Sequence, residues 1–321
     1  MSYWADKRVL VTGGSGFVGS NLLEALRAVG CRDFFVVRRC DYDLTRQAEV
    51  ERLFADHHPQ ILLHLAGLVG GILANQERPA EFFYQNLMMG TLLTHYASRS
   101  GVEKMVSAGA GCGYPEHAPL PLQESCFWDG YPQKESAPYS LAKRMLTVQA
   151  EAYYRQYGFV ALVGVPGNIY GPNDNFDLYQ AHVIPALVRK FVEAVEEDQP
   201  EVVVWGTGKP ARDFVYVGDV ARGLLGMVEH YDRPALVNLS RGRATAVREV
   251  VERLVEITGF RGRVRWDTTK PEGQECRRFD VSRARAEMGF VARVDLDEGL
   301  RRTVEWFRAH RGALVGGRVL A

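Results

Sequence analysis

Tyr139 and Lys143 are the residues whose types and spacing most directly indicate proton chemistry. Residues four apart lie on one face of a helix, so this spacing brings a phenol and an ammonium group together. The ammonium group favours the phenolate and is expected to lower the pKa of Tyr139, which lets the tyrosine exchange a proton with a substrate oxygen near neutral pH. Such pairs also occur on ordinary helices, so the surrounding segments decide what this pair means.

Three glycines stand three residues apart in the segment TGGSGFVGS, between an expected strand and an expected helix: Gly13, Gly16 and Gly19. A tight turn, close approach of the backbone to a pyrophosphate and tight helix packing each require a residue without a side chain, and a helix N-terminus supplies anion-binding N–H groups. The spacing is GxxGxxG instead of GxGxxG, and a purely structural turn is the alternative. Because the flanking strand and helix give the required context, we predict a dinucleotide site that also includes Phe17 and Val18.

Arg38 and Arg39 directly follow the second expected strand. An enzyme that prefers NAD typically has an acidic residue here, against the ribose 2′-hydroxyl, whereas arginine suits the 2′-phosphate of NADP. We therefore predict NADP(H) as the cofactor and Arg39 as its phosphate contact, with a solvated surface pair as the alternative. Further cofactor contacts are expected at Asp43, near the adenine, and at Leu65, Ala66 and Gly67.

Short apolar runs alternate with longer amphipathic runs in the first half of the chain, as in βαβ units on a parallel sheet. Strands are expected at 8–12, 34–37, 61–65, 104–107 and 160–165, with helices from 17 and 47 and at 79–100 and 139–157. The stretch 109–138 is rich in glycine and proline and too long for an ordinary connection, which makes it a candidate active-site segment.

The expected fold class is α/β, a doubly wound parallel-sheet Rossmann fold with a smaller C-terminal substrate-binding domain. Residues 1–165 are expected to form the NADP-binding domain, to which segments about 213–240 and 293–311 return. The segments about 166–212 and 241–292 are expected to form the substrate-binding domain.

The overall composition excludes several classes of protein. The 39 basic and 39 acidic residues balance, so no net charge draws the chain to nucleic acid or to a membrane surface. The five cysteines form no CxxC pair, which argues against a zinc site or a disulfide scaffold. We therefore expect no bound metal. We also expect a cytoplasmic enzyme, because the chain has neither a signal-peptide pattern nor an apolar run of membrane-spanning length.

Several segments, in order and over nearly the whole chain, resemble the GDP-L-fucose synthase family of the extended short-chain dehydrogenase/reductases. They are HLAGLVGGILANQERPAEFFYQN, GCGYP, APYSLAK, GNIYGPNDNF, HVIPALVRKF, VVVWGTGKPARDFVYVGDVA and TTKPEG. In that family one active site epimerises C3 and C5 of GDP-4-keto-6-deoxymannose and then reduces the C4 ketone with NADPH. The resemblance therefore implies a GDP-sugar substrate.

The resemblance also implies roles for individual residues. Tyr139 is expected to donate the proton at C4 while Lys143 tunes it and holds the nicotinamide ribose, and Cys112 and His182 are expected to be the acid–base pair of epimerisation. From residue type alone, Cys112 would more often be a small buried hydrophobe and His182 a residue at a helix start. The substrate-binding positions, where solvated charges and a core tryptophan are the alternatives, are Asn168, His182, Lys190, Trp205, Arg212 and Lys270.

Ala110 breaks the family pattern, because the family has a catalytic serine four residues before the tyrosine of its CxYP motif. That serine helps to polarise the C4 carbonyl, so this chain lacks one donor that reduction is expected to use. The alternatives are an epimerase with little net reduction and a non-catalytic NADP-sensing protein. A homodimer is also expected through the helices at 79–100 and 139–157, with Leu92, Leu93, Met145 and Val148 as contacts.

Overall fold

A six-stranded parallel sheet forms the centre of the nucleotide-binding part of the molecule. The structure is a computed structural model and describes residues 2–270, 273–315 and 318–319. The strands, in their order across the sheet, are β10 (Ala235–Leu239), β5 (Val160–Pro166), β4 (Lys104–Ala108), β3 (Ile61–His64), β1 (Arg8–Thr12) and β2 (Asp33–Val37). Each neighbouring pair is parallel, so the carboxyl ends of all six strands lie at one edge.

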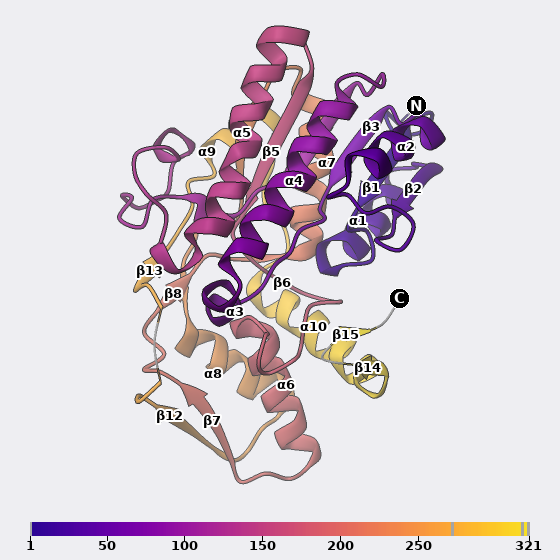
Figure 1. Ribbon diagram of the computed structural model, residues 1–321. Helices are drawn as coiled ribbons and strands as arrows, with labels where there is room; N and C mark the ends of the chain where they lie inside the picture. The colour runs from indigo at the N-terminus through magenta and orange to yellow at the C-terminus, as the bar shows by residue number, and fades with distance from the viewer. Residues whose placement is uncertain (1, 271–272, 316–317, 320–321) are drawn as a thin grey trace.

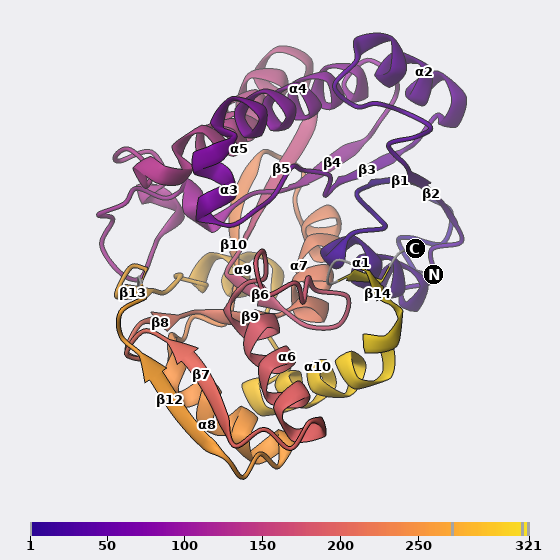
Figure 2. The same cartoon turned by 60° about the horizontal axis from the view of Figure 1, so that its bottom comes forward.

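Helices cover both faces of this sheet, because its strands are apolar on both sides. One face packs against α1 (Phe17–Ala28) and α7 (Val217–His230), and the other against α2 (Gln47–His57), α4 (Pro79–Ala97) and α5 (Ala137–Tyr157). Figure 2 shows the sheet between these two layers. The strand order reverses between β1 and β3, which is the position where doubly wound sheets bind ligands. The predicted fold class is confirmed.

The second part of the molecule lies beyond the carboxyl edge of the sheet (Figure 1). Its apolar core includes side chains of three helices, α6 (Val183–Glu196), α8 (Val247–Thr258) and α10 (Leu296–His310). Two small sheets belong to it, one of β7 (Glu201–Trp205) with β12 (Arg263–Asp267), the other of β8 (Ala211–Arg212) with β11 (Thr245–Ala246) and β13 (Cys276–Arg277).

The remaining elements connect or flank these parts. They are α3 (Ile72–Glu77), β6 (Asn168–Tyr170) with β9 (Phe214–Tyr216), α9 (Ser282–Met288) and the hairpin of β14 (Leu314–Val315) and β15 (Arg318–Val319). No helix within the described residues is long and apolar enough to cross a membrane.

Two sequence-based expectations differ from the structure. The segment 293–311 was expected to return to the first domain, but Leu300, Val304 and Phe307 of α10 pack with the core of α6 and α8. The amphipathic pattern of α10 predicts a buried face but not the partner of that face. Leu93 was expected to contact a second subunit, but its side chain is fully buried between α4 and the sheet.

Candidate active site

The glycine turn after β1 is shaped so that side chains cannot enter it. Gly13 has φ of 70°, and a Cβ atom there would lie 2.6 Å from the amide nitrogen of Ala66. A Cβ atom at Gly19 would lie 2.1 Å from the carbonyl oxygen of Gly13. Gly16 caps α1 without a side-chain hydrogen bond, and Phe17 and Val18 follow it in the first turn. The backbone amides at this helix start fit a pyrophosphate group.

The segment after β3 crosses directly beside this turn. Thr12 Oγ1 lies 2.8 Å from His64 Nδ1 and accepts a hydrogen bond of 3.2 Å from the amide of Ala66. Burial lowers the pKa of His64 to about 3, with a smaller contribution from the charge of Lys143, so this histidine is neutral at physiological pH. The uncharged side chains of Thr12 and His64 hold the segment of the predicted cofactor residues Leu65, Ala66 and Gly67 against the glycine turn.

Arg39 and Asp43 follow β2 at the same edge of the sheet. The Arg39 side chain is exposed, whereas Asp43 Oδ1 accepts hydrogen bonds from the amide and the hydroxyl of Thr45. These two bonds, and to a lesser degree the charge of Arg39, lower the pKa of Asp43. Arg39 is therefore a cation accessible to solvent, next to the place expected for the adenosine.

Tyr139 and Lys143 lie in the first turns of α5. Lys143 Nζ donates a hydrogen bond of 3.1 Å to the carbonyl oxygen of Ala108, and burial lowers the pKa of its ammonium group to about 8. The Tyr139 ring packs edge to face on Phe82 with 6.2 Å between centroids. Burial, and then the charge of Cys112, raise the pKa of Tyr139, so the expected lowering by Lys143 is wrong. Desolvation of the phenol is the larger cause, and Tyr139 keeps its proton at neutral pH.

Cys112 comes from the long Gly- and Pro-rich stretch, in the short helical turn Gly111–Gly113. Its charge acts on Tyr139 and Lys143, so the fold brings three of the four predicted catalytic residues together. His182, the fourth, is the residue before α6 in the second part of the molecule. Its side chain is accessible, yet the protein around it removes enough water to lower the pKa of the imidazole.

Trp205, Lys190 and Lys270 form one group at the end of β7. Lys190 Nζ lies 5.6 Å and Lys270 Nζ 5.5 Å from the Trp205 ring centroid, and 58% of the tryptophan side chain is exposed. Lys190 Nζ also donates to the carbonyl oxygen of Val203. An exposed aromatic ring flanked by two ammonium groups can receive an anionic ligand that also has a planar or apolar part.

Arg212 lies opposite Arg277 in the pairing of β8 with β13. Burial and the charge of Arg277 lower the pKa of Arg212, while the charge of Cys112 acts on Arg277. Arg277 therefore connects the predicted substrate cations to the predicted catalytic thiol. The sequence alone does not indicate Arg277 as a site residue, because its position depends on pairing with a distant strand.

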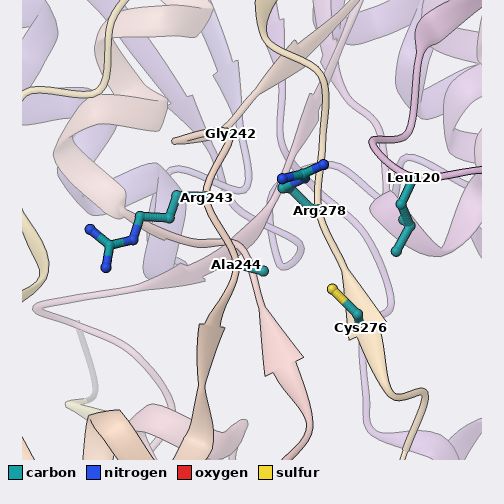
Figure 3. Close-up of a pocket in the computed structure, with 6 residues that line it drawn as sticks. All are labelled: Leu120, Gly242, Arg243, Ala244, Cys276 and Arg278. Atoms are coloured by element: carbon teal, nitrogen blue, oxygen red, sulfur yellow. The ribbon is translucent and has the colours of Figure 1, made fainter.

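The residues on either side of Arg277 line a separate cavity. Cys276 and Arg278, together with Leu120 and Gly242, line a cavity of about 400 Å³ (Figure 3). Alternation along extended backbone separates these side chains from Arg277. Once β13 is known to pair with β8, this alternation distinguishes Arg277 from Cys276 and Arg278.

Asp213 is a buried carboxylate between these segments. It accepts hydrogen bonds from the amides of Arg241, Gly242 and Phe279, at 3.1, 3.0 and 3.2 Å. Its own backbone carbonyl accepts from the amide of Asn168 at 2.8 Å, which fixes that predicted substrate residue in β6. Burial raises the pKa of Asp213, and these bonds oppose the rise.

Ala110 precedes the turn that carries Cys112. It is buried in extended conformation, with φ of −142° and ψ of 133°. Its methyl group supplies no hydrogen-bond donor where the family pattern predicts a hydroxyl.

Known proteins are similar to this chain over nearly its whole length. Residues 9–240 match the model of the NAD dependent epimerase/dehydratase family. The chain is 38% identical to GDP-L-fucose synthase 1 of Arabidopsis thaliana, over 96% of this chain and 95% of that one. It is 34% identical to GDP-L-fucose synthase of Escherichia coli K12, over 94% and 97%. A GDP-L-fucose synthetase from Naegleria fowleri, solved with NADP bound, superposes with a TM-score of 0.89 at 25% identity, covering 97% of this chain and 96% of that one.

Proposed function

This chain belongs to the GDP-L-fucose synthase family, and we propose that it epimerises and reduces a GDP-linked 4-keto-6-deoxy sugar with NADPH. The observation that carries the proposal is the meeting of Tyr139, Lys143 and Cys112 beside the glycine turn of a dinucleotide fold. A proton donor, a cation and a thiol at one place are the groups that enolisation and carbonyl reduction need.

NADP(H) is the cofactor, and the Naegleria fowleri relative was solved with it. The turn from Gly13 to Gly19 would hold its pyrophosphate, Arg39 its 2′-phosphate, and Lys143 its nicotinamide ribose. The bound cofactor supplies the hydride for the reduction. Leu65, Ala66 and Gly67 would line its path from the glycine turn towards α5.

The GDP-sugar would bind between the two parts of the molecule. Arg212, Arg277, Lys190 and Lys270 provide cations for its diphosphate, and Trp205 provides an aromatic surface. A C4 ketone acidifies the two adjacent C–H bonds, so the Cys112 thiolate can remove a proton and His182 can return one on the opposite face. Tyr139 then gives its proton to the C4 oxygen as the ketone is reduced.

Mass spectrometry of the products tests this function. We expect GDP-4-keto-6-deoxymannose in deuterated water to gain deuterium at the carbons next to the ketone without NADPH, and to be reduced when NADPH is added. Cys112→Ala should abolish the exchange, whereas Cys126→Ala, a matched change in a neighbouring partly buried thiol, should leave it unchanged. Absence of both exchange and reduction in the unaltered protein would remove the proposal.

A second candidate function is epimerisation with little net reduction, which Ala110 specifically favours. In this case exchange would proceed at full rate while NADPH oxidation remained slow. The same experiment separates the two functions, because it measures exchange and oxidation independently.

We also propose a homodimer formed by α4 and α5. Val148 on α5 is 47% exposed and Tyr84 on α4 is 56% exposed, which leaves apolar surface on this helix pair. Val148→Asp should shift the sedimenting species from dimer to monomer. Val291→Asp, at an equally exposed valine after α9 on the α7 side of the sheet, should not. A monomeric mass for the unaltered protein would exclude the dimer.

The cytoplasm is the proposed location. All five cysteines are unpaired, which suits a reducing compartment.

A further inference from the structure

Arg144 is a buried cation that the proposed reaction does not use. It follows Lys143 on α5 and is only 3% exposed. Its Nη1 donates a hydrogen bond of 2.8 Å to the carbonyl oxygen of Gly130, and its Nε donates to the carbonyl oxygen of Gly113. Gly113 is the residue after Cys112, so the guanidinium group binds the backbone of the catalytic turn.

The charge of Arg144 has no carboxylate partner among the ion pairs of the described residues. Its group packs against the rings of Phe127 and Trp128, at 5.4 and 5.1 Å from their centroids, and Nη2 is buried without a hydrogen-bond partner. Burying an unpaired charge is costly, so a compensating negative charge is expected nearby. Burial lowers the pKa of Arg144, and the charge of Cys112 opposes this.

We propose that Arg144 is a positioning residue that holds the Cys112 turn and stabilises its sulfur as the thiolate. The proposal deepens the function proposed above, because a thiolate is the form that can remove the proton next to the ketone. The aromatic rings on one side of the guanidinium group keep water away, which strengthens its attraction for a nearby negative charge.

Three other groups interact electrostatically with Cys112. Tyr139 and Lys143 come from α5, and Arg277 comes from β13. Lys143 loses its charge near pH 8, when the pKa of its buried ammonium group is reached, whereas an arginine stays charged throughout this range. Arg144 and Arg277 are therefore the cations that act on the thiol at every pH of interest.

The rate of Cys112 alkylation at pH 7 tests the proposal. Iodoacetamide reacts with the thiolate, and peptide mass spectrometry assigns the rate to Cys112 in the full-length chain. Arg144→Gln should slow this alkylation by about ten- to a hundredfold, because loss of an adjacent opposite charge lowers the thiolate fraction by roughly that factor.

Two further variants separate charge from structure. Arg144→Lys keeps the positive charge and should restore most of the alkylation rate, while Arg155→Gln, at an exposed arginine of the same helix, should leave the rate unchanged. An unchanged Cys112 alkylation rate in folded Arg144→Gln would overturn the proposal. If that variant does not fold, the unaltered protein decides, and Cys112 alkylation at pH 7 no faster than that of the exposed Cys40 overturns the proposal.

Deuterium exchange into the sugar distinguishes this inference from the proposed function. Slower Cys112 alkylation in Arg144→Gln together with no exchange in the unaltered protein would support the charge interaction and remove the epimerase function. Exchange in the unaltered protein with an unchanged Cys112 alkylation rate in the variant would do the opposite.

Discussion

The nucleotide end and the catalytic end of the candidate site are formed by different kinds of groups. At the nucleotide end, the backbone packs so closely at Gly13 and Gly19 that no side chain fits, and the proposed ligand contacts are backbone amides. At the catalytic end, Lys143 and Arg144 are buried charged side chains around the turn that carries Cys112. The nucleotide end should therefore be sensitive to added volume, and the catalytic end to altered charge and hydrogen bonding.

Gly19→Ala is expected to have the largest effect. Its methyl group would lie 2.1 Å from the carbonyl oxygen of Gly13, and backbone cannot move aside as a flexible side chain can. We expect NADPH binding to become undetectable by calorimetric titration and stability to fall by about 1–3 kcal/mol or more. Gly312→Ala is the matched control, because a methyl group there meets nothing within 4 Å. Equal NADPH affinity in the two variants would contradict the steric explanation.

Ala110→Ser tests the catalytic end by adding a hydroxyl group. One missing donor to a developing oxyanion typically costs a factor of about 10² to 10³, so the variant should oxidise NADPH faster by up to that amount. Solvent-deuterium exchange should stay nearly unchanged, because the proposed enolisation uses Cys112 and His182. Unchanged or slower oxidation would mean that another group already takes the place of the serine.

Arg39→Ala tests the nucleotide end. Arg39 is an exposed side-chain cation, whereas the other proposed phosphate contacts at this end are backbone amides. Loss of one charge-assisted hydrogen bond costs about 1.5–3 kcal/mol, so the preference for NADPH over NADH should fall by about ten- to a hundredfold. Arg32→Ala, at an exposed arginine just before β2, should keep the preference. Equal affinity of the unaltered protein for both cofactors would refute the role of Arg39.

His64→Gln is expected to have the smallest effect at neutral pH, and it concerns the junction between the two ends. The folded pKa of His64 is about 3 against an ordinary value of 6.5, so the unfolded chain binds more protons between these values. The stability that neutral His64 contributes is complete above about pH 6.5 and is lost as the pH falls towards 3, at roughly 1.4 kcal/mol per unit. Urea unfolding at several pH values should show a shallower acid loss in the variant. Parallel pH dependences would exclude His64 as the cause.

The difference between the two ends also explains what the sequence could predict. The glycine turn depends on residues that are adjacent in the chain, and the structure shows the expected backbone geometry at Gly13 and Gly19. Tyr139 and Lys143 could be placed on one helix, but the pKa of Tyr139 depends on burial, which spacing alone does not give. Only the family resemblance indicates Cys112 as a catalytic residue.

Other parts of the site depend on contacts between distant segments. Arg277 reaches the site because β13 pairs with β8, and the register of that pairing is not encoded locally. Arg144 follows Lys143, yet nothing in the helical pattern shows that it binds the carbonyl oxygen of Gly113. The partner of α10 was misjudged for the same reason, since an amphipathic helix specifies its apolar face and not the surface that receives it.

The hydrogen bonds of Asp213 have a mechanical consequence. Its carboxylate holds the amides of Arg241, Gly242 and Phe279, and its own amide donates to the carbonyl oxygen of Arg277 at 3.0 Å. The backbones that carry Arg212 and Arg277 are thus held together. Under the proposed function, a dianionic ligand would meet both charges together, so capture of the diphosphate would be one event instead of two successive ones.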